Sequence, residues 1–214
     1  MQPRRIAREL ALLSIGQLSA AAQFSESQEI EAAMTAAIRT LSEEIRETLE
    51  AAAADLNRSS DRLLESEIKA TDVNSAREML KDAITLTQTA VNRLGATLEL
   101  PELIQVTHLP EVREFAYTLV KTCRQQRPQL DEILSNALVD WQLSRLAKID
   151  RNILRLAIAE IHFLKIPDRV AINEAIELAK RYSTEDGHRF INGVLRRVTQ
   201  KRAEAAAVSD SPLT

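Results

Sequence analysis

The chain has 214 residues, of which 45% are hydrophobic, and a formal net charge of −3. With only four glycines and six prolines, the composition predicts an all-α protein of one or two domains. A single cysteine excludes an internal disulfide framework and suits a reducing cytoplasm. No run approaches the roughly 20 apolar residues of a membrane span, and the net charge excludes a protein that is basic as a whole.

The first predicted helix spans about residues 3–20 and begins with arginines. Arg4, Arg5 and Arg8 fall within an arc of about 100° at its start. Positive charge at a helix N-terminus opposes the helix dipole, so these residues do not stabilise the helix. Planar, permanently charged guanidinium groups suit an RNA backbone, and we predict a phosphate clamp. A solvated, frayed basic end is the alternative on charge alone. Two arginines followed by an amphipathic segment do not resemble a signal peptide.

Residues 25–72 are acidic, with 12 carboxylate and five basic side chains. Their apolar residues recur at alternating steps of three and four, as in a coiled coil. Thr71 and Asp72 interrupt the pattern and predict the cap of a second helix. We therefore expect an antiparallel helical hairpin, either with a long first helix or with a break near residues 51–57. A spacer and a protein-binding arm are both compatible with this segment.

The next part of the chain predicts a bundle of shorter helices. Pro101 and Pro110 mark the connection out of the hairpin. Val112 to Cys123 forms one strongly amphipathic helix, and Pro128 begins another.

Three further helical periods follow, and each has clear boundaries. Asp150 is predicted to cap the first, and Pro167 to stop it. The second runs from about Val170 to Tyr182. The third begins with a predicted capping box. In it, the Ser183 side chain accepts a hydrogen bond from a free backbone amide of the first turn, and the Asp186 side chain accepts one from the backbone amide of Ser183. Residues after 202 lack a large apolar face and predict a frayed tail.

Catalytic and cofactor-binding patterns are missing from the sequence. The three histidines share no helix face with a second metal ligand, and no glycine-rich phosphate loop occurs. Cys123 lies on an apolar stripe and predicts a packed core thiol. Glu174 and Glu177 share a helix without metal-binding companions. We therefore expect neither an enzyme nor a bound cofactor or metal.

A second basic segment, residues 187–202, has five Lys or Arg side chains and no acid. Together with the arginines at the start, it predicts a cationic face on an otherwise acidic molecule. The usual cationic last turn of a helix would explain the end of this segment but not Arg189. Stacking of bases would have few aromatic candidates, chiefly Tyr182 and Phe190.

Residues 150–198 carry a specific resemblance. The matching stretches are Asp150-Arg151, Ile153-Leu154-Arg155-Leu156-Ala157, Ile166-Pro167, Val170-Ala171-Ile172-Asn173-Glu174-Ala175-Ile176-Glu177-Leu178-Ala179-Lys180 and Phe190-Ile191-Asn192-Gly193-Val194-Leu195. In order and spacing they resemble the NusB family of transcription antitermination factors. The match covers roughly residues 111–199, and residues 4–9 are similar to the family's arginine-rich opening. Residues 24–108 do not match.

The resemblance implies a fold and its parts. NusB proteins are all-helical and consist of two packed helical subdomains. Here that predicts an N-terminal helix in residues 1–23, an acidic helical insertion in 24–108, a helical core in 109–200 and a flexible tail in 201–214.

The resemblance also implies a function that involves RNA and a protein partner. NusB proteins bind boxA RNA of ribosomal leader transcripts together with ribosomal protein NusE. With RNA polymerase and other Nus factors, they suppress premature termination in the cytoplasm. The implied RNA-binding residues are Arg4, Arg5, Arg8, Gln17, Asp186, His188, Arg189 and Phe190. The implied NusE-binding residues are Arg145, Asp150 and Arg151. The alternative is a NusB-fold protein-interaction or rRNA-docking module without antitermination activity.

Overall fold

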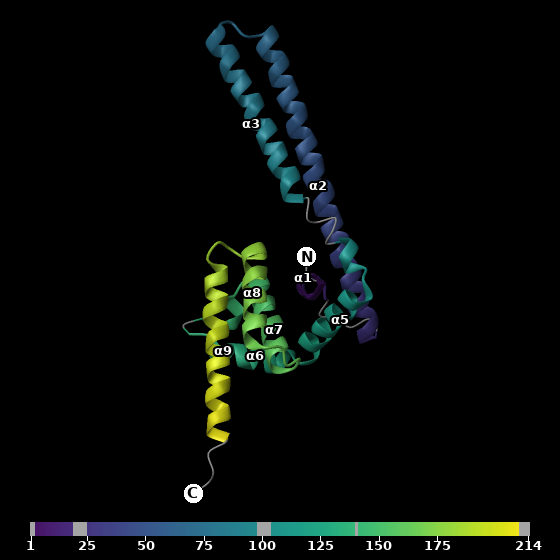
Figure 1. Ribbon diagram of the computed structural model, residues 1–214, viewed down its shortest axis with the longest axis vertical. Helices are drawn as coiled ribbons and strands as arrows, with labels where there is room; N and C mark the ends of the chain where they lie inside the picture. The colour runs from purple at the N-terminus through teal and green to yellow at the C-terminus, as the bar shows by residue number, and fades with distance from the viewer. Residues whose placement is uncertain (1–2, 19–24, 98–103, 140, 210–214) are drawn as a thin grey trace. The chain divides into compact units, whose positions relative to one another are not determined.

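The computed structural model describes residues 3–18, 25–97, 104–139 and 141–209, and the regular structure of these residues is helical. The all-α prediction is confirmed. The named elements are α1 (Pro3–Gln17), α2 (Glu26–Ile68), α3 (Val73–Thr97), α5 (Pro110–Gln125), α6 (Arg127–Ala137), the 3-10 helix η1 (Leu143–Arg145), α7 (Lys148–His162), α8 (Asp168–Tyr182) and α9 (Gly187–Ser209) (Figure 1).

The chain forms two compact units, Met1–Ala37 with Thr107–Thr214, and Ile38–Val106. The predicted insertion began at residue 24, but the first turns of α2 pack with the first unit. Ile30 and Met34 of these turns are fully buried. An ion pair joins Glu31 on α2 to Arg113 on α5. These contacts move the boundary of the second unit to residue 38.

Helix α7 is the centre of the first unit. Its residues from Asn152 to Ile161 are all buried, because it contacts α1, α5, α6, α8 and α9. A helix that is covered on every side must be apolar nearly all round, and its polar residues must find partners inside the protein. This requirement decides the position of several charged side chains described below.

Two predicted helix caps are wrong. Helix α7 begins at Lys148 with Ala147 in the cap position, and Asp150 lies inside its first turn. The Asp150 carboxylate instead accepts a hydrogen bond from the Ser183 hydroxyl. Ser183 therefore does not form the predicted capping box. Helix α9 starts at Gly187, and the Asp186 carbonyl accepts the amide hydrogens of Arg189 and Phe190. A tertiary contact has replaced the local one in both cases.

Proline positions agree with the sequence patterns. Pro110 is the first residue of α5, and a proline also lies in the first turn of α6. Helix α7 ends at His162, before Pro167, and Lys165 in the connection adopts a left-handed φ of 56°. Helix α8 begins directly after Pro167, two residues earlier than predicted.

The second unit is an antiparallel helical hairpin of α2 and α3, which lie side by side in Figure 1. Helix α2 continues without a break for 43 residues, about 65 Å of helix, so the predicted alternative of a break near residues 51–57 is wrong. The predicted cap at Asp72 is confirmed: its carboxylate accepts the amide hydrogens of Asn74 and Ser75 at 2.8 and 2.9 Å. These hydrogen bonds, the one from Ser75 most strongly, lower the pKa of Asp72.

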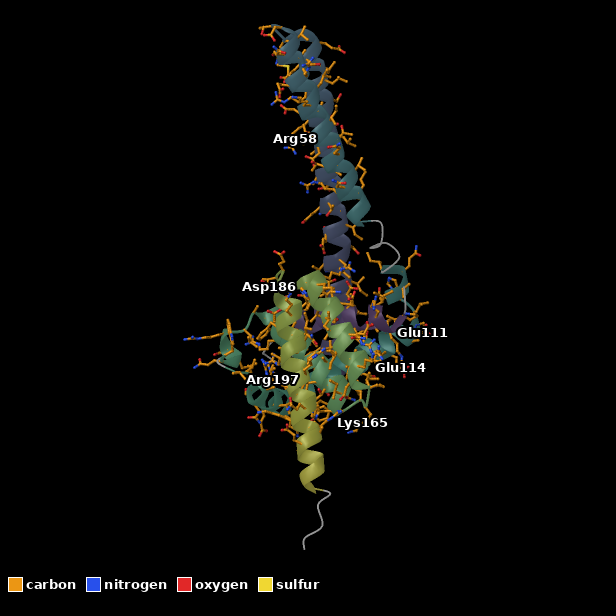
Figure 2. All side chains as sticks on the ribbon, turned by 60° about the vertical axis from the view of Figure 1, so that its left-hand side comes forward. Arg58, Glu111, Glu114, Lys165, Asp186 and Arg197 are labelled. Atoms are coloured by element: carbon orange, nitrogen blue, oxygen red, sulfur yellow. The ribbon has the colours of Figure 1, made fainter. Side chains whose placement is uncertain are left out.

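The hairpin is joined by small and polar residues. Ser59 on α2 donates a hydrogen bond to the Ala83 carbonyl on α3 at 2.8 Å. Asp55 on α2 is buried and accepts hydrogen bonds from Arg58 and, at 2.9 Å, from Arg93 on α3. Figure 2 shows Arg58 on this unit. Buried Asp55 lies where the sequence permitted a helix break, so the ion pairs hold the helices together there.

No helix in the described part of the chain combines the length and apolar character that a membrane crossing requires.

Candidate nucleic-acid interface

Arg8 is buried inside the first unit. Its Nε donates to Oε1 of Glu160 at 2.9 Å, and a second guanidinium nitrogen lies 2.7 Å from the same oxygen. A third nitrogen is 3.9 Å from the Glu174 carboxylate. With 4% of its side chain exposed, Arg8 holds α1 against α7 through a buried ion pair. This geometry argues against the predicted contact of Arg8 with an RNA phosphate.

Arg5 lies at the surface but already has a carboxylate partner. Its Nε and a terminal nitrogen donate to the two oxygens of Glu174 at 3.1 and 3.0 Å, a bidentate pair. The Arg5 side chain is 48% exposed. An exposed ion pair contributes little to stability, so a phosphate can compete with Glu174 for this guanidinium.

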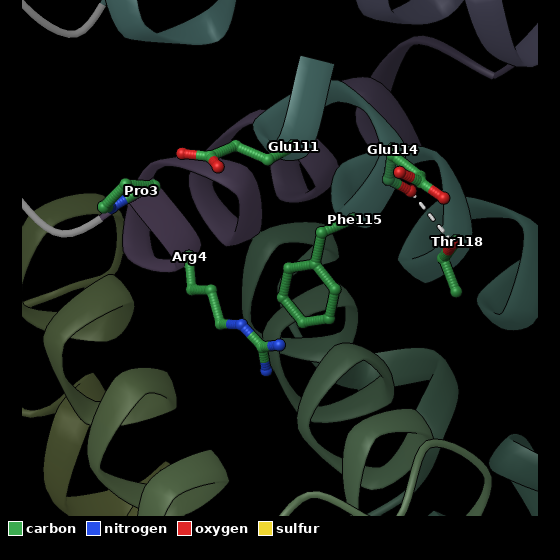
Figure 3. Close-up of a pocket in the computed structure, with 6 residues that line it drawn as sticks. All are labelled: Pro3, Arg4, Glu111, Glu114, Phe115 and Thr118. Carbon is green, nitrogen blue, oxygen red and sulfur yellow. Dashed lines mark hydrogen bonds between the residues drawn. The ribbon is translucent and has the colours of Figure 1, made fainter. Parts of the chain in front are cut away.

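Arg4 projects across α5. Its guanidinium carbon lies 5.1 Å from the centre of the Phe115 ring, a cation–π contact that Figure 3 shows. Around it is an open cavity of about 670 Å³, lined also by Glu111 and Glu114. The two carboxylates reduce the attraction of this cavity for an anion. Arg4 and Arg5 are the exposed members of the predicted clamp.

A second cavity, of about 310 Å³, lies where α9 begins. We call it the Trp141 pocket. It is lined by Trp141, Arg145, Leu146, Ala147, Asp150, Thr184, Asp186, Gly187 and Phe190. The rings of Trp141 and Phe190 are 6.2 Å apart and tilted by 59°, a favourable aromatic arrangement. Trp141 is 57% exposed, so its ring is accessible.

The Trp141 pocket brings together residues from both predicted surfaces. Asp186 and Phe190 were predicted to bind RNA, and Arg145 and Asp150 to bind a protein partner. The other predicted residues lie elsewhere: Gln17 is exposed at the end of α1, and His188 is half-buried in the first turn of α9.

Two predicted arginines, Arg189 and Arg151, do not line this pocket. Arg189 is exposed and pairs with Asp186 at 3.1 Å. Arg151 donates to the Leu143 carbonyl at 3.5 Å and lines a separate cavity. The exposed Arg189 adds a cation beside the Trp141 pocket, whereas Arg151 does not contribute to it.

The cations in the middle of α9 bind the ends of neighbouring helices. Arg197 and Lys201 donate to the Ala137 and Asn136 carbonyls at the end of α6, at 2.8 and 2.7 Å. Arg202 donates to the Ile161 carbonyl near the end of α7, and one of its terminal nitrogens donates to both carboxylate oxygens of Asp168. Figure 2 shows Arg197 on α9. Positive charge there compensates the helix dipoles and caps free carbonyls, so these residues have a structural role.

The same contacts change the interpretation of the chain's end. Helix α9 extends to Ser209, so the first nine residues of the predicted flexible tail 201–214 are helical. The remaining five lie outside the described residues.

Helix α8 contacts both helices that carry the predicted cationic segments, α1 and α9. It packs against α9, and its Glu174 binds Arg5 on α1. Further along, Arg181 pairs with Glu9 of α1 at 3.1 Å, and the Tyr182 hydroxyl donates to the same carboxylate. Tyr182 is thereby engaged with Glu9 and is not a free stacking platform. The predicted continuous cationic face from Arg5 to Arg189 stays a prediction.

Cys123 is buried, and burial raises the pKa of its thiol to about 12. We therefore expect the folded protein to react with a thiol reagent at about pH 8 far more slowly than the unfolded chain, because only about one thiol in 10⁴ is ionised. Absorbance during labelling, with and without guanidinium chloride, measures this. Equal rates would show that Cys123 is accessible and reactive.

Among the described residues, no group of three or more His, Cys, Asp or Glu side chains could hold a metal ion.

Comparison with known proteins defines the family. The family model described as NusB family matches residues 74–200, more than half of the chain. The chain belongs to the NusB family. The transcription antitermination protein NusB of Synechocystis sp. is 57% identical over 97% of this chain and 96% of its own length. NusB of Gloeothece citriformis is 54% identical over 94% of both chains. A solved structure of T. maritima NusB is 30% identical, covers 73% of this chain and 91% of that chain, and has a TM-score of 0.43.

The family model and the relatives correct the predicted extent of the NusB match. The family model begins at residue 74, inside α3, and not at residue 111. An alignment that covers 97% of this chain must include most of residues 24–108. The acidic segment is therefore shared with this NusB relative and is not an isolated insertion.

Sequence reasoning missed Trp141 as a candidate for stacking. The stacking candidates from the sequence were chiefly Tyr182 and Phe190, yet the Trp141 ring is exposed beside Phe190. The available signal was a tryptophan in a segment with polar neighbours, Asp140 and Gln142, where no apolar period requires a large ring. The contact between Phe115 and Arg4 could not be read from local spacing, because the two residues lie on helices far apart in the sequence.

Proposed function

We propose that this protein is a transcription antitermination factor that binds boxA-type RNA together with ribosomal protein NusE. In this role it acts with RNA polymerase and other Nus factors in the cytoplasm, and has no catalytic activity of its own. The observation that carries the proposal is the 57% identity, over nearly the whole chain, to a protein named transcription antitermination protein NusB.

The proposed RNA contacts differ from the sequence prediction in two residues, because Arg8 is removed from the set and Trp141 is added. Arg4 and Arg5 are exposed and suited to phosphates, whereas Arg8 holds α1 in place from the inside. Trp141 joins Phe190 as a surface on which an unstacked base can lie. Gln17, Asp186, His188 and Arg189 complete the proposed RNA set. Arg145, Asp150 and Arg151 remain the proposed NusE contacts.

Titration of a fluorescent boxA RNA tests the proposal. We expect binding that tightens when NusE is added and weakens when Arg4 and Arg5 are both replaced by alanine. On a plot of log affinity against log salt concentration, the slope should decrease by about 0.7 for each phosphate that the variant no longer neutralises. Fluorescence anisotropy at several salt concentrations measures both effects.

The matched control is Arg46→Ala with Arg62→Ala on the hairpin, since both arginines are exposed and their loss changes the net charge equally. If both double variants weaken RNA binding equally, the effect comes from net charge alone and the phosphate clamp is refuted.

A NusB-fold interaction or rRNA-docking module without antitermination activity is the second candidate. It is favoured by the neutralisation of Arg5 and the burial of Arg8, which leave few free cations on α1. Transcription across a terminator by purified RNA polymerase, with NusE and the other Nus factors present, separates the two functions. Increased read-through supports antitermination, and unchanged read-through with retained RNA or NusE binding supports the module.

A further inference from the structure

A third cavity of the first unit, of about 470 Å³, is strongly basic. It lies between the end of α1, the end of α5, the start of α6 and the first turns of α7. Its lining residues are Ile15, Leu18, Cys123, Arg124, Arg127, Lys148, Arg151, Asn152 and Arg155. Five of the nine are cationic and none is acidic. We call this cavity the basic pocket.

Carboxylates outside the lining neutralise only part of this charge. Arg124 pairs with Glu29, and Arg155 forms a bidentate pair with Asp131 at 2.6 and 2.8 Å. The other three cations, Arg127, Lys148 and Arg151, form no ion pair with a carboxylate of the described residues. Lys148 donates to the Gly16 carbonyl at 3.0 Å, and a carbonyl carries no net charge. The pocket therefore has an excess of about three positive charges.

Two guanidinium nitrogens of the lining residues lack a hydrogen-bond partner within the described chain. They are a terminal nitrogen of Arg124 and Nε of Arg151, and both are inaccessible to solvent. Buried donors are nearly always satisfied in native proteins, and an unsatisfied one costs about 1–3 kcal/mol. The hydrogen-bonding capacity of the lining guanidinium groups is therefore not fully met within the described chain.

We propose that the basic pocket binds a phosphate group. A phosphate has several acceptor oxygens that match the planar forks of Arg127 and Arg151, and Lys148 supplies a compact third charge. The apolar residues Ile15 and Leu18 line the same cavity, so its volume can also receive a sugar or a base. The phosphate has two possible sources, a strand of RNA or a free nucleotide. The pocket contains neither Arg4 nor Arg5 and shares only Arg151 with the proposed NusE contacts, so variants of Arg127 and Lys148 test it separately from the proposed function.

Calorimetric titration of the full-length protein with inorganic phosphate, AMP and a short single-stranded RNA without a boxA sequence tests this proposal. The test variant is Arg127→Ala with Lys148→Ala, since both side chains are exposed and neither forms an ion pair that the fold requires. We expect binding to the wild-type protein and at least a roughly tenfold loss in this variant. The control is Arg169→Ala with Lys180→Ala, exposed cations outside the pocket, which should bind within about twofold of wild type.

The three ligands distinguish the sources of phosphate. Binding of AMP and inorganic phosphate that the test variant loses supports a free-nucleotide site. Binding of RNA alone, abolished in the same variant, supports contacts to a strand. No binding to the wild-type protein, equal loss in both double variants, or equally tight binding of acetate would overturn the proposal. Circular dichroism melting checks that both variants remain folded.

Discussion

Replacing Arg8 with alanine is expected to lower the free energy of unfolding by about 3–5 kcal/mol. The substitution leaves the buried Glu160 carboxylate, which is 1% exposed, without the guanidinium that donates to it. The protein interior cannot solvate that charge, so the folded state loses more than the pair itself contributes. Urea unfolding followed by circular dichroism measures the change.

The double variant Arg8→Met with Glu160→Leu tests the cause. Removal of both charges leaves no unpaired group, so most of the lost stability should return. Arg4→Ala on the same helix is the control, and we expect it to lose at most about 1 kcal/mol because Arg4 is exposed and its guanidinium lies over the Phe115 ring. A double variant no more stable than Arg8→Ala would show that packing, and not charge burial, is lost.

The stability deficit of Arg8→Ala should also depend on pH. Burial raises the pKa of Glu160, and the hydrogen bond from Arg8 opposes this rise in the wild type. Without Arg8 the folded-state pKa rises further above its unfolded value, so the folded state binds the proton more tightly. The deficit is then full above the raised pKa and shrinks as the pH falls towards the unfolded pKa. Unfolding curves at about pH 8 and about pH 5 should show a smaller deficit at the lower pH.

Arg8 also shows where sequence reasoning about this fold fails. Helical spacing placed it in one arc with Arg4 and Arg5, as on an exposed face. Helix α1, however, is buried on nearly all sides from Ile6 onwards, because it packs against both α5 and α7. The partner of Arg8 is 152 residues away, so no local pattern could reveal it. A buried charge is recognisable from sequence only when its partner lies within a few positions on the same helix.

The predictions that succeeded depend on local chemistry. Proline positions, the cap at Asp72 and the hairpin follow from backbone rules that act within a few residues. The family was recognisable because polar residues at fixed spacing inside helices are a specific signal. The cations of α9 were ambiguous for the opposite reason. Their spacing did not indicate whether they face RNA, whereas in the structure the side chains of Arg197 and Lys201 donate hydrogen bonds to carbonyls at the end of α6.

Replacement of Gly187 with alanine is expected to destabilise the protein by about 1–3 kcal/mol. A Cβ at this position would lie 1.9 Å from Oγ and 2.7 Å from Cβ of Ser183. Ser183 cannot yield freely, because its hydroxyl donates to the Asp150 carboxylate on α7. The connection between α8 and α9 must therefore shift, and with it Thr184 and Asp186 of the Trp141 pocket. Thermal or urea unfolding measures the loss.

The expected sign makes this substitution informative. Within a helix, glycine to alanine ordinarily stabilises by about 0.5–1 kcal/mol, so a loss must come from the close approach to Ser183. Ser183→Gly removes both clashing atoms, and combined with Gly187→Ala it should recover the steric part of the loss. Ser183→Gly alone measures the cost of the hydrogen bond to Asp150 and of the added backbone freedom. If the loss of unfolding free energy in the double variant equals the sum of the losses in the two single variants, the two positions do not interact. Recovery would show that the missing side chain at residue 187 allows α8 and α9 to meet at the Trp141 pocket.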